Sequence, residues 1–217
     1  MGGDMPTGHL LGLNGGSSAG KTTLARKLQT SLDGPWLLFG IDLFFWALPA
    51  EMVGDPGGIR IFDGEIQRGP DFTRLYRGYQ RAVATVVSSG IDVILDEVLL
   101  DGIEDQHRWE EALGDLPVCW VAVHCHPDTA TTREHERGDR PPGVARKQAA
   151  SVHRGVRYDV ELDTSVMSVV DSVSLLADNV RQRWSISSTR PTDTPPGLPP
   201  ISAWSPDSTR RLPPWER

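Results

Sequence analysis

Short apolar runs alternate with helical patterns along most of this chain. Apolar runs of about four to eight residues are typical of buried strands, and apolar residues that recur every three or four positions are typical of helices. By these patterns we expect strands at residues 9–14, 36–41, 92–95, 118–125 and 160–163. We expect helices at residues 22–31, 71–89, 104–113, 129–136, 145–152 and 166–183. The alternation predicts a three-layer α/β fold, in which helices cover both faces of a mostly parallel central sheet.

Two segments break the alternation. Residues 53–70 are rich in Gly, Asp and Pro, a composition that predicts a mobile loop outside the core. Toward the C-terminus the chain is rich in Pro, Ser, Thr and Arg, which bury too little apolar surface to offset the entropy lost on ordering. We therefore expect a folded domain at residues 1–184 and a disordered or extended tail at residues 185–217. A polyproline segment that binds a partner through Trp204 or Trp215 is the alternative for the tail.

Length and charge exclude several classes of protein. A chain of 217 residues is long enough for one α/β domain with a substantial core. The net charge of −7 and the pI of about 5.3 argue against a nucleic-acid-binding protein, which usually carries a basic face. No apolar stretch approaches the roughly 18 residues of a membrane span, and the N-terminus has no basic-then-apolar signal. We expect a cytoplasmic protein with no membrane partner.

The two cysteines, Cys119 and Cys125, fall in or beside one expected strand. They would share a face of that strand but lie roughly 20 Å apart along it, so no disulfide can form within the strand. Their spacing also matches no metal site. We expect two reduced thiols, as in cytosolic proteins.

A phosphate-binding pattern lies between the first expected strand and the first expected helix. Residues Gly15 to Thr22 read GGSSAGKT and fit G-x-x-x-x-G-K-[ST]. Such a turn directs backbone N–H groups at an anion, and the helix N-terminus adds its dipole. A flexible glycine turn is the alternative, but the pattern favours a site for ATP. The residues expected to bind the nucleotide are Gly15, Gly16, Ser17, Ser18, Ala19, Gly20, Lys21, Thr22 and Thr23.

Three side chains are expected to serve the phosphates and a Mg²⁺ ion. Lys21 would reach the β- and γ-phosphates, and the hydroxyl of Thr22 would bind the metal. The run VILDE places Asp96 at the carboxyl end of a strand, which lies beside the phosphate loop in this fold class. Asp96 would hold Mg²⁺ directly or through water, and Glu97 could take or share that role. An acid that only caps the next turn is the alternative.

A second acid, Asp42, follows Phe39-Gly40-Ile41 at the end of the second expected strand. In small-molecule kinases built on such a sheet, the acceptor lies near that strand end. A carboxylate there could orient an attacking hydroxyl and take its proton. Asp42 could also cap a helix that begins at Leu43, and the two roles do not exclude each other.

Three arginines, Arg133, Arg137 and Arg140, lie close together in the chain. Phosphoryl transfer develops charge on the equatorial oxygens, and guanidinium groups neutralise such charge. A lid that brings these arginines over the nucleotide would also exclude water. A solvated helix with Glu–Arg pairs is the alternative.

Taken together, these segments resemble the chloramphenicol phosphotransferase family over about residues 9–170. The matching segments are LNGGSSAGK at 13–21, PWLLFGID at 35–42, the Asp96–Glu97 strand end, RW at 108–109, GDLPVCWVAVHC at 114–125, the arginine cluster at 133–140 and the run from KQA to DT at 147–164. The resemblance implies an ATP-dependent O-phosphotransferase that modifies a primary hydroxyl of chloramphenicol and so confers resistance. It also implies that Asp42 is the acceptor-side base, and it strengthens the catalytic assignment of the arginines.

The chain departs from the family beside Asp42. The segment 43–46 is more aromatic than in the family, residues 54–69 are divergent, and the family often has two Asp residues where this chain has Asp96 and Glu97. Because pocket walls set specificity, these differences bear on the identity of the acceptor more than on the type of reaction. An apolar aromatic pocket would be lined by Phe45, Trp46, Met52 and Tyr79. The alternative is that these residues belong to the core, which the sequence favours more for Tyr79 than for Trp46.

We therefore expect Asp42, Trp46 and Glu97 to bind a small-molecule alcohol. One alternative is a kinase for another alcohol, such as a sugar or a natural product. Another is a nucleotide-binding regulator that recruits a partner through its tail, binds ATP tightly and transfers negligible phosphate. Assembly into a homo-oligomer is left open by the sequence.

Overall fold

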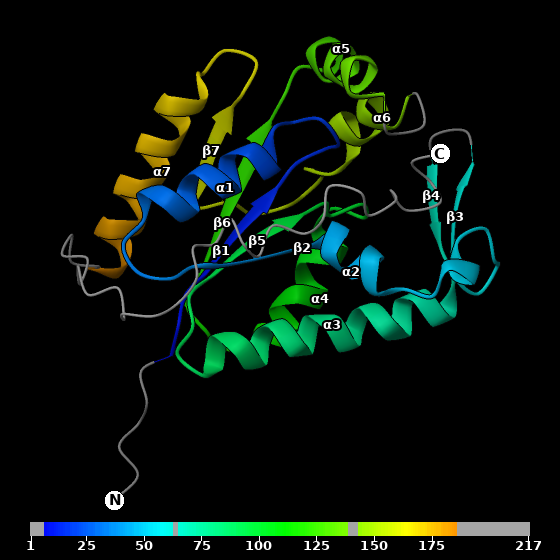
Figure 1. Ribbon diagram of the computed structural model, residues 1–217, viewed down its shortest axis with the longest axis horizontal. Helices are drawn as coiled ribbons and strands as arrows, with labels where there is room; N and C mark the ends of the chain where they lie inside the picture. The colour runs from blue at the N-terminus through cyan, green and yellow to red at the C-terminus, as the bar shows by residue number, and fades with distance from the viewer. Residues whose placement is uncertain (1–6, 63–64, 139–142, 186–217) are drawn as a thin grey trace, which may run out of the picture.

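The computed structural model describes residues 7–62, 65–138 and 143–185. Within these residues, a five-stranded parallel sheet with the strand order β2-β5-β1-β6-β7 forms the centre of the molecule (Figure 1). Its strands are β1 (Leu10–Asn14), β2 (Leu37–Gly40), β5 (Val93–Glu97), β6 (Val118–His124) and β7 (Val160–Asp163). β1 lies in the middle, where Gly12 pairs with Leu95 of β5 and with Trp120 of β6.

Seven α-helices accompany the sheet in the described ranges. They are α1 (Lys21–Ser31), α2 (Ile41–Ala47), α3 (Pro70–Ser88), α4 (Ile103–Leu113), α5 (Pro127–Arg137), α6 (Val144–Ser151) and α7 (Val169–Trp184). α1 and α7 cover one face of the sheet, whereas α3 and α4 cover the other (Figure 1). α5 and α6 pack against each other beyond the carboxyl ends of the strands. The three-layer α/β fold with a mostly parallel sheet is therefore confirmed.

Side chains of β5 alternate between the two cores of the domain. Ile94 packs in the core under α1 and α7, and Leu95 packs in the core under α3 and α4. Because side chains of a strand alternate between its faces, Asp96 follows Ile94 and Glu97 follows Leu95. The two acids at the carboxyl end of this strand therefore belong to different sides of the sheet.

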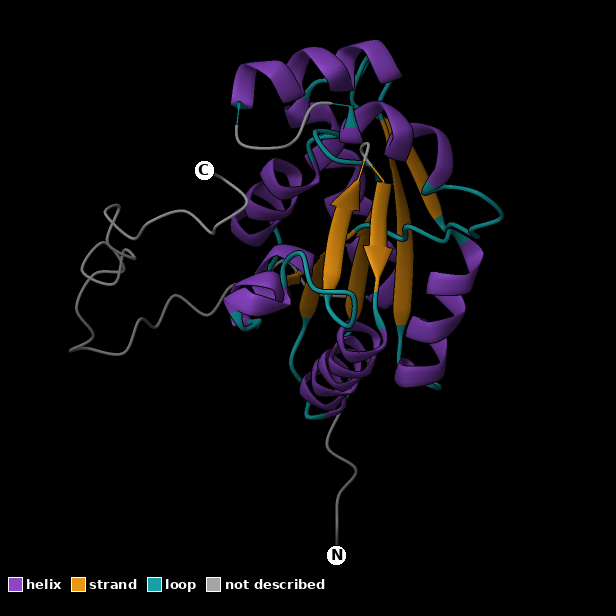
Figure 2. Ribbon diagram, turned by 90° about the vertical axis from the view of Figure 1, so that its right-hand side faces the viewer, coloured by secondary structure: helices purple, strands orange, loops and turns teal. Residues whose placement is uncertain are grey.

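The prediction of a loop over residues 53–70 is wrong. This segment contains an antiparallel hairpin, β3 (Ile59–Phe62) and β4 (Glu65–Arg68), which lies in front of the main sheet in Figure 2. Ile59 is 4% exposed and anchors the hairpin in the core under α3. The glycines and prolines mark the turns at the ends of the strands, and they obscured two strands of only four residues each.

The other expected elements are all present: the strand at residues 160–163 has the expected bounds, and the others have shifted ends. The second strand ends at Gly40, so that Ile41 and Asp42 form the first turn of α2. Cys119 and Cys125 are free thiols, as expected, and burial raises the pKa of Cys119 to about 11. Among the described residues, no helix is long and apolar enough to cross a membrane. Of the expected tail only Ser185 is described, and both Trp204 and Trp215 lie outside the described residues.

Candidate active site

The phosphate loop connects β1 to α1 and depends on two of its glycines. Gly20 has φ +90° and takes the left-handed conformation that favours glycine, directly before α1 begins at Lys21. A Cβ atom on Gly15 would lie 2.4 Å from the carbonyl oxygen of Val123, so a side chain cannot be accommodated there. Ser18 also has a positive φ, of 58°, which is uncommon for a residue other than glycine. The backbone of the loop is therefore held in a specialised conformation.

The interior of the loop offers polar groups to an anion. Lys21 is 7% exposed, and its Nζ donates a 2.9 Å hydrogen bond to the carbonyl oxygen of Gly16. The hydroxyls of Ser17 and Ser18 are buried and have no hydrogen-bond partner among the described residues. Because buried polar groups are normally paired, these hydroxyls fit a polar ligand such as the phosphates of a nucleotide.

Thr22 and Asp96 meet at the mouth of the loop. The Oγ1 atom of Thr22 donates a 2.5 Å hydrogen bond to Oδ2 of Asp96, and Nζ of Lys21 lies 3.9 Å from Oδ1 of the same carboxylate. Mg²⁺ prefers such hard oxygen ligands and takes few of them from the protein, with waters and phosphate oxygens completing its shell. No cluster of three metal-binding side chains occurs in the described part of the chain. The pair therefore fits a metal that a nucleotide brings with it.

Asp42 lies in the first turn of α2 and lines the same hollow as Lys21, Thr22 and Asp96. The end of β2 holds it there. A Cβ atom on Gly40 would lie 2.7 Å from the carbonyl oxygen of Asp96, so only glycine lets the two strand ends come this close. α2 begins at Ile41 with Gly40 as its N-cap, so Asp42 lies inside the first turn and is not the N-cap residue of a helix that begins at Leu43. The structure thus brings together the acids expected for the metal and for the acceptor.

Glu97 lies in a second hollow, on the α3 side of the sheet. It is fully buried, its Oε1 accepts a 3.0 Å hydrogen bond from the backbone N–H of Val98, and its Oε2 has no partner among the described residues. Burial raises the pKa of Glu97 to about 8. Ile41 and Val98 line both hollows, which are therefore adjacent. The other residues that line this second hollow are Phe45, Ile59, Ile66, Arg68, Phe72, Tyr76, Leu100 and Gln148.

The aromatic residues expected in the acceptor pocket separate into two groups. Phe45 lines the second hollow, whereas Trp46 is 52% exposed and is not among the residues that line it. Met52 and Tyr79 pack against the core under α3. The Tyr79 hydroxyl donates a 3.0 Å hydrogen bond to the carbonyl oxygen of Gly40 and so supports the strand end that carries Asp42.

The arginines take different places around the loop. Arg137 lines the hollow of the phosphate loop. Arg133 is turned toward β7, because its guanidinium donates hydrogen bonds to Oγ1 of Thr164 at 3.1 Å and to its carbonyl oxygen at 2.9 Å. Arg140 lies outside the described residues. The alternative of a solvated helix therefore holds only in part for α5. Arg137 is exposed, as in a solvated helix, but it also lines the hollow of the phosphate loop.

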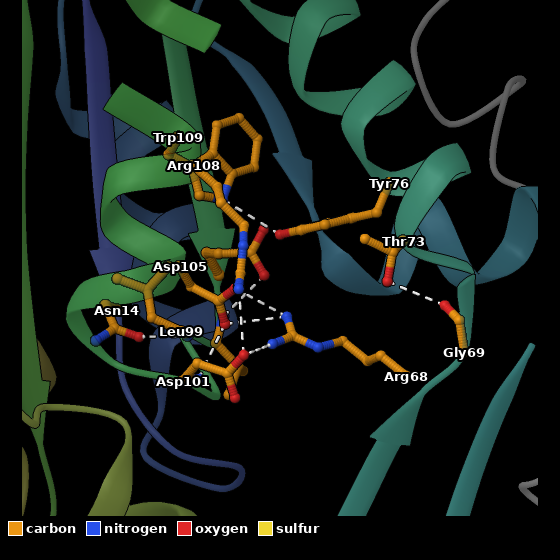
Figure 3. Close-up of polar contacts among 12 residues, drawn as sticks. Asn14, Arg68, Gly69, Thr73, Tyr76, Leu99, Asp101, Asp105, Arg108 and Trp109 are labelled. Carbon is orange, nitrogen blue, oxygen red and sulfur yellow. Dashed lines mark hydrogen bonds and ion pairs between the residues drawn. The ribbon is translucent and has the colours of Figure 1, made fainter. Parts of the chain in front are cut away.

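Figure 3 shows the charged network that fastens the hairpin beside the second hollow. Nη1 of Arg68 donates to both carboxylate oxygens of Asp105, at 2.9 and 3.0 Å, and Nη2 faces Asp101. Arg108 contacts the same two acids. The Nε1 of Trp109 donates a 3.2 Å hydrogen bond to the Tyr76 hydroxyl, deeper in the same region.

Three polar residues of the site were not found from the sequence. Asn14 donates to the carbonyl oxygen of Val152 and to the Tyr158 hydroxyl, and accepts from the backbone N–H of Leu99. Gln148 accepts from the backbone N–H of Ser17, and Thr164 donates to the carbonyl oxygen of Ala19. A polar residue at the end of a buried strand was the only signal for Asn14. Gln148 and Thr164 lie in the KQA-to-DT segment without any local sign of their contacts.

Comparisons of sequence place the chain among known proteins. A family model described as chloramphenicol phosphotransferase-like protein matches residues 8–184. A protein named as a candidate O-phosphotransferase in two strains of Mycobacterium tuberculosis is 35% identical over 182 residues. The match covers 76% of this chain and 79% of that relative.

Solved structures resemble the fold at low sequence identity. The APS kinase CysC of Mycobacterium tuberculosis, in complex with AMPPNP and APS, is 13% identical with a TM-score of 0.58, covering 82% of this chain and 99% of its own. The tunicamycin resistance protein of Deinococcus radiodurans is 16% identical with a TM-score of 0.58, covering 80% and 95%. The shikimate kinase of Acinetobacter baumannii, in complex with shikimate, is 14% identical with a TM-score of 0.51, covering 82% and 96%. At such identities the likeness shows the fold alone, which is that of the P-loop kinases.

Proposed function

The chain belongs to the chloramphenicol phosphotransferase-like family, and from this premise we propose that it is an ATP-dependent O-phosphotransferase. In this proposal it transfers the γ-phosphate of ATP to a hydroxyl of chloramphenicol or a related small molecule, and so confers resistance. One observation carries the proposal. Asp42 lines the same hollow as Lys21, Thr22 and Asp96, so an acceptor-side carboxylate faces the phosphate-binding groups.

The phosphate loop would bind the triphosphate. The loop amides, Lys21 and the buried hydroxyls of Ser17 and Ser18 supply donors for phosphate oxygens. Thr22 and Asp96 would hold Mg²⁺, which neutralises charge on the phosphate oxygens when it is bound. The contact between Thr22 and Asp96 supports this assignment, because it brings two hard oxygen ligands together at the mouth of the loop.

Asp42 would act on the acceptor. Its carboxylate accepts the proton of the attacking hydroxyl as the hydroxyl oxygen bonds to the γ-phosphorus. The bond between that phosphorus and the β–γ bridging oxygen breaks, and ADP leaves. The position of Asp42 in the first turn of α2, where it lines the hollow of the phosphate loop, supports this role.

The arginines would stabilise the charge that develops on the transferring phosphoryl group. Arg137 is best supported, because it lines the hollow of the phosphate loop. Arg133 lies beside the loop, since its Nη1 would be 3.8 Å from a Cβ atom on Gly20, and its bonds to Thr164 hold it there. Arg140 stays a prediction from the sequence.

The second hollow would receive the body of the acceptor. Its wall is largely aliphatic and aromatic, which suits a partly apolar alcohol, and Glu97 adds one buried carboxyl group. Trp46 lies on the exposed part of α2 and would contribute only from the rim.

A screen of hydroxylated antibiotics and metabolites tests this function. Each compound, with chloramphenicol first, is incubated with the protein, ATP and Mg²⁺, and mass spectrometry detects the gain of one phosphate. Phosphorylation of chloramphenicol is the expected result. Phosphorylation of another alcohol alone would retain the phosphotransferase and reject the antibiotic as its acceptor. Tight ATP binding without transfer to any compound would contradict the proposal and favour a nucleotide-binding regulator.

A further inference from the structure

Gln148 of α6 lies between the two hollows of the site. Its side-chain oxygen Oε1 accepts a 2.7 Å hydrogen bond from the backbone N–H of Ser17 in the phosphate loop. The same residue lines the hollow that contains Glu97. Gln148 is 6% exposed, so this contact is made away from solvent, where a hydrogen bond is strong and an unpaired group is costly.

The loop contact fixes the orientation of the Gln148 amide. Oxygen and nitrogen of an amide look alike, but only the oxygen can accept from a backbone N–H. The amide nitrogen therefore points away from the loop. It makes no hydrogen bond to another residue that the structure describes, and it is not one of the described atoms that are buried without a partner, so it is accessible to solvent. An accessible N–H₂ group at the wall of a hollow can donate to a hydrogen-bond acceptor on a ligand.

The packing around α6 holds Gln148 in this place. Gly16 lies against α6, because a Cβ atom on it would be 3.0 Å from the backbone nitrogen of Ala149. At the start of α6, the carboxylate of Glu134 accepts 2.8 Å hydrogen bonds from the backbone N–H groups of Gly143 and Ala145. Glu134 is 3% exposed and belongs to α5, the helix that also carries Arg137. Gln148 thus stands on a helix that is fixed to both the loop and α5.

The other polar groups of the second hollow leave this role to Gln148. The two terminal nitrogens of Arg68 face Asp101 and Asp105. Glu97 can donate an O–H but no N–H, and only while its carboxyl group is protonated, and the remaining walls are aliphatic or aromatic apart from Tyr76, whose hydroxyl accepts from Nε1 of Trp109. An oxygen atom of the acceptor that enters this hollow therefore meets the Gln148 amide as its uncommitted N–H donor.

We propose that Gln148 is a specificity-determining residue that binds the phosphate loop with its carbonyl oxygen and the acceptor with its N–H₂ group. This inference rests on the proposed phosphotransferase function. It narrows the acceptor to an alcohol that carries a second oxygen, such as a carbonyl, nitro or ether oxygen, apart from the hydroxyl that reacts. The same amide contacts the phosphate loop, which binds the nucleotide, and the hollow that receives the acceptor. A nucleotide that orders the loop therefore also orders this amide and strengthens the binding of the acceptor.

Gln148→Met tests the inference, because methionine has a similar volume but offers neither the oxygen nor the N–H₂ group. Gln182→Met, at an exposed position of α7, is the matched control. The acceptor is chloramphenicol, or the alcohol that the screen identifies. We expect the KM for the acceptor to rise roughly 3- to 10-fold in Gln148→Met, as for the loss of one buried hydrogen bond. Calorimetry should show that AMPPNP tightens acceptor binding in the wild type, whereas this tightening is lost in Gln148→Met.

The outcomes separate the two proposals. The role of Gln148 would be overturned if the wild type is active and Gln148→Met differs from the control by less than about twofold, both in the KM for the acceptor and in the effect of AMPPNP on acceptor binding. The proposed phosphotransferase function would then still stand. A wild type that phosphorylates no alcohol would contradict the proposed function and this inference with it. If circular dichroism shows that Gln148→Met is unfolded, Gln148→Asn takes its place. The side chain of asparagine is one methylene shorter, so its amide cannot contact both the loop and the acceptor. We therefore expect the same rise in KM and the same loss of tighter acceptor binding with AMPPNP. Wild-type tightening by AMPPNP in Gln148→Asn would refute the contact of this residue with both sites.

Discussion

Asp96 and Glu97 are consecutive residues of β5 whose carboxyl groups lie on opposite sides of the sheet. Asp96 accepts the 2.5 Å hydrogen bond of Thr22 beside the phosphate loop, whereas Glu97 is fully buried in the hollow on the α3 side. Strand geometry alone enforces this separation, because successive side chains alternate between the two faces. The two acids should therefore be separable by mutation.

Asp96→Asn should raise the Mg²⁺ concentration for half-maximal transfer by roughly 10-fold or more, because a neutral amide is a poor ligand for this ion. Glu97→Gln should leave that concentration within about twofold and change the KM for the acceptor instead. A Mg²⁺ titration of the phosphorylation rate measures both. Asp115→Asn, at an exposed position, is the control. Equal Mg²⁺ effects of the two substitutions would show that Glu97 shares the metal.

Asp42→Asn should keep ATP affinity and reduce transfer by a factor of roughly 10² or more, because the amide cannot accept the proton of the acceptor hydroxyl. ATP affinity is measured by calorimetry and transfer by mass spectrometry of the product. Asp55→Asn, which replaces another exposed acid of the same region, should change neither. A nearly normal rate in Asp42→Asn would leave this residue with only a structural role.

Arg68→Met should destabilise the domain by about 2 kcal/mol, measured by urea denaturation. The substitution removes one partner of Asp105, whose side chain is 3% exposed, and such losses cost up to about 3–5 kcal/mol for a fully buried pair. The effect is smaller here because Arg108 still contacts Asp105. The acceptor KM should also rise, because Arg68 fastens the hairpin that borders the second hollow.

Arg74→Met is the control for this experiment. Arg74 is 73% exposed and lies 3.9 Å from Asp71, which is 63% exposed, so its loss should cost less than about 0.5 kcal/mol. If the two variants were equally stable, the contacts of Arg68 with Asp101 and Asp105 would contribute nothing to the stability of the fold.

The sequence predicts the parts of this site that local patterns encode, and no others. The phosphate loop and Asp96 follow from a motif and from the end of an apolar strand. Gln148 contacts Ser17 across 131 residues, and Thr164 contacts Ala19 across 145, so nothing near either residue in the chain indicates its partner. Such contacts form only when the sheet brings β1, α6 and β7 together.

The hairpin illustrates the same limit for the fold. β3 and β4 have four residues each, and their strand character depends on Ile59 entering the core and on Arg68 meeting Asp101 and Asp105. Those partners are 33 and 37 residues further along the chain. The local composition of glycine and proline therefore dominated the prediction, and it favoured a loop.

His153 gives the domain a pH-dependent stability. Its Nδ1 lies 2.7 Å from the Tyr158 hydroxyl, and its ring centre lies 4.2 Å from that of His124. Burial lowers the pKa of His153 to about 4 from 6.5, with further lowering by His124 and Lys21 and an opposing effect of Glu161. Between these two pH values the unfolded chain binds a proton that the folded chain excludes. The stability contributed by neutral His153 is therefore present above pH 6.5 and lost as the pH falls toward 4.

Over the same range Glu97 has the opposite effect, because its pKa is raised to about 8, so the contribution of His153 is measured as a difference between variants. In urea denaturation between pH 4.5 and 7, His153→Gln should reduce the slope of the midpoint against pH relative to the wild type, because glutamine can still contact Tyr158 but binds no proton. The difference in slope between the two proteins corresponds to at most about one bound proton per molecule. His107→Gln, at an exposed position of α4, should keep the slope of the wild type. An unchanged slope in His153→Gln would mean that His153 is protonated as readily in the folded chain as in the unfolded one.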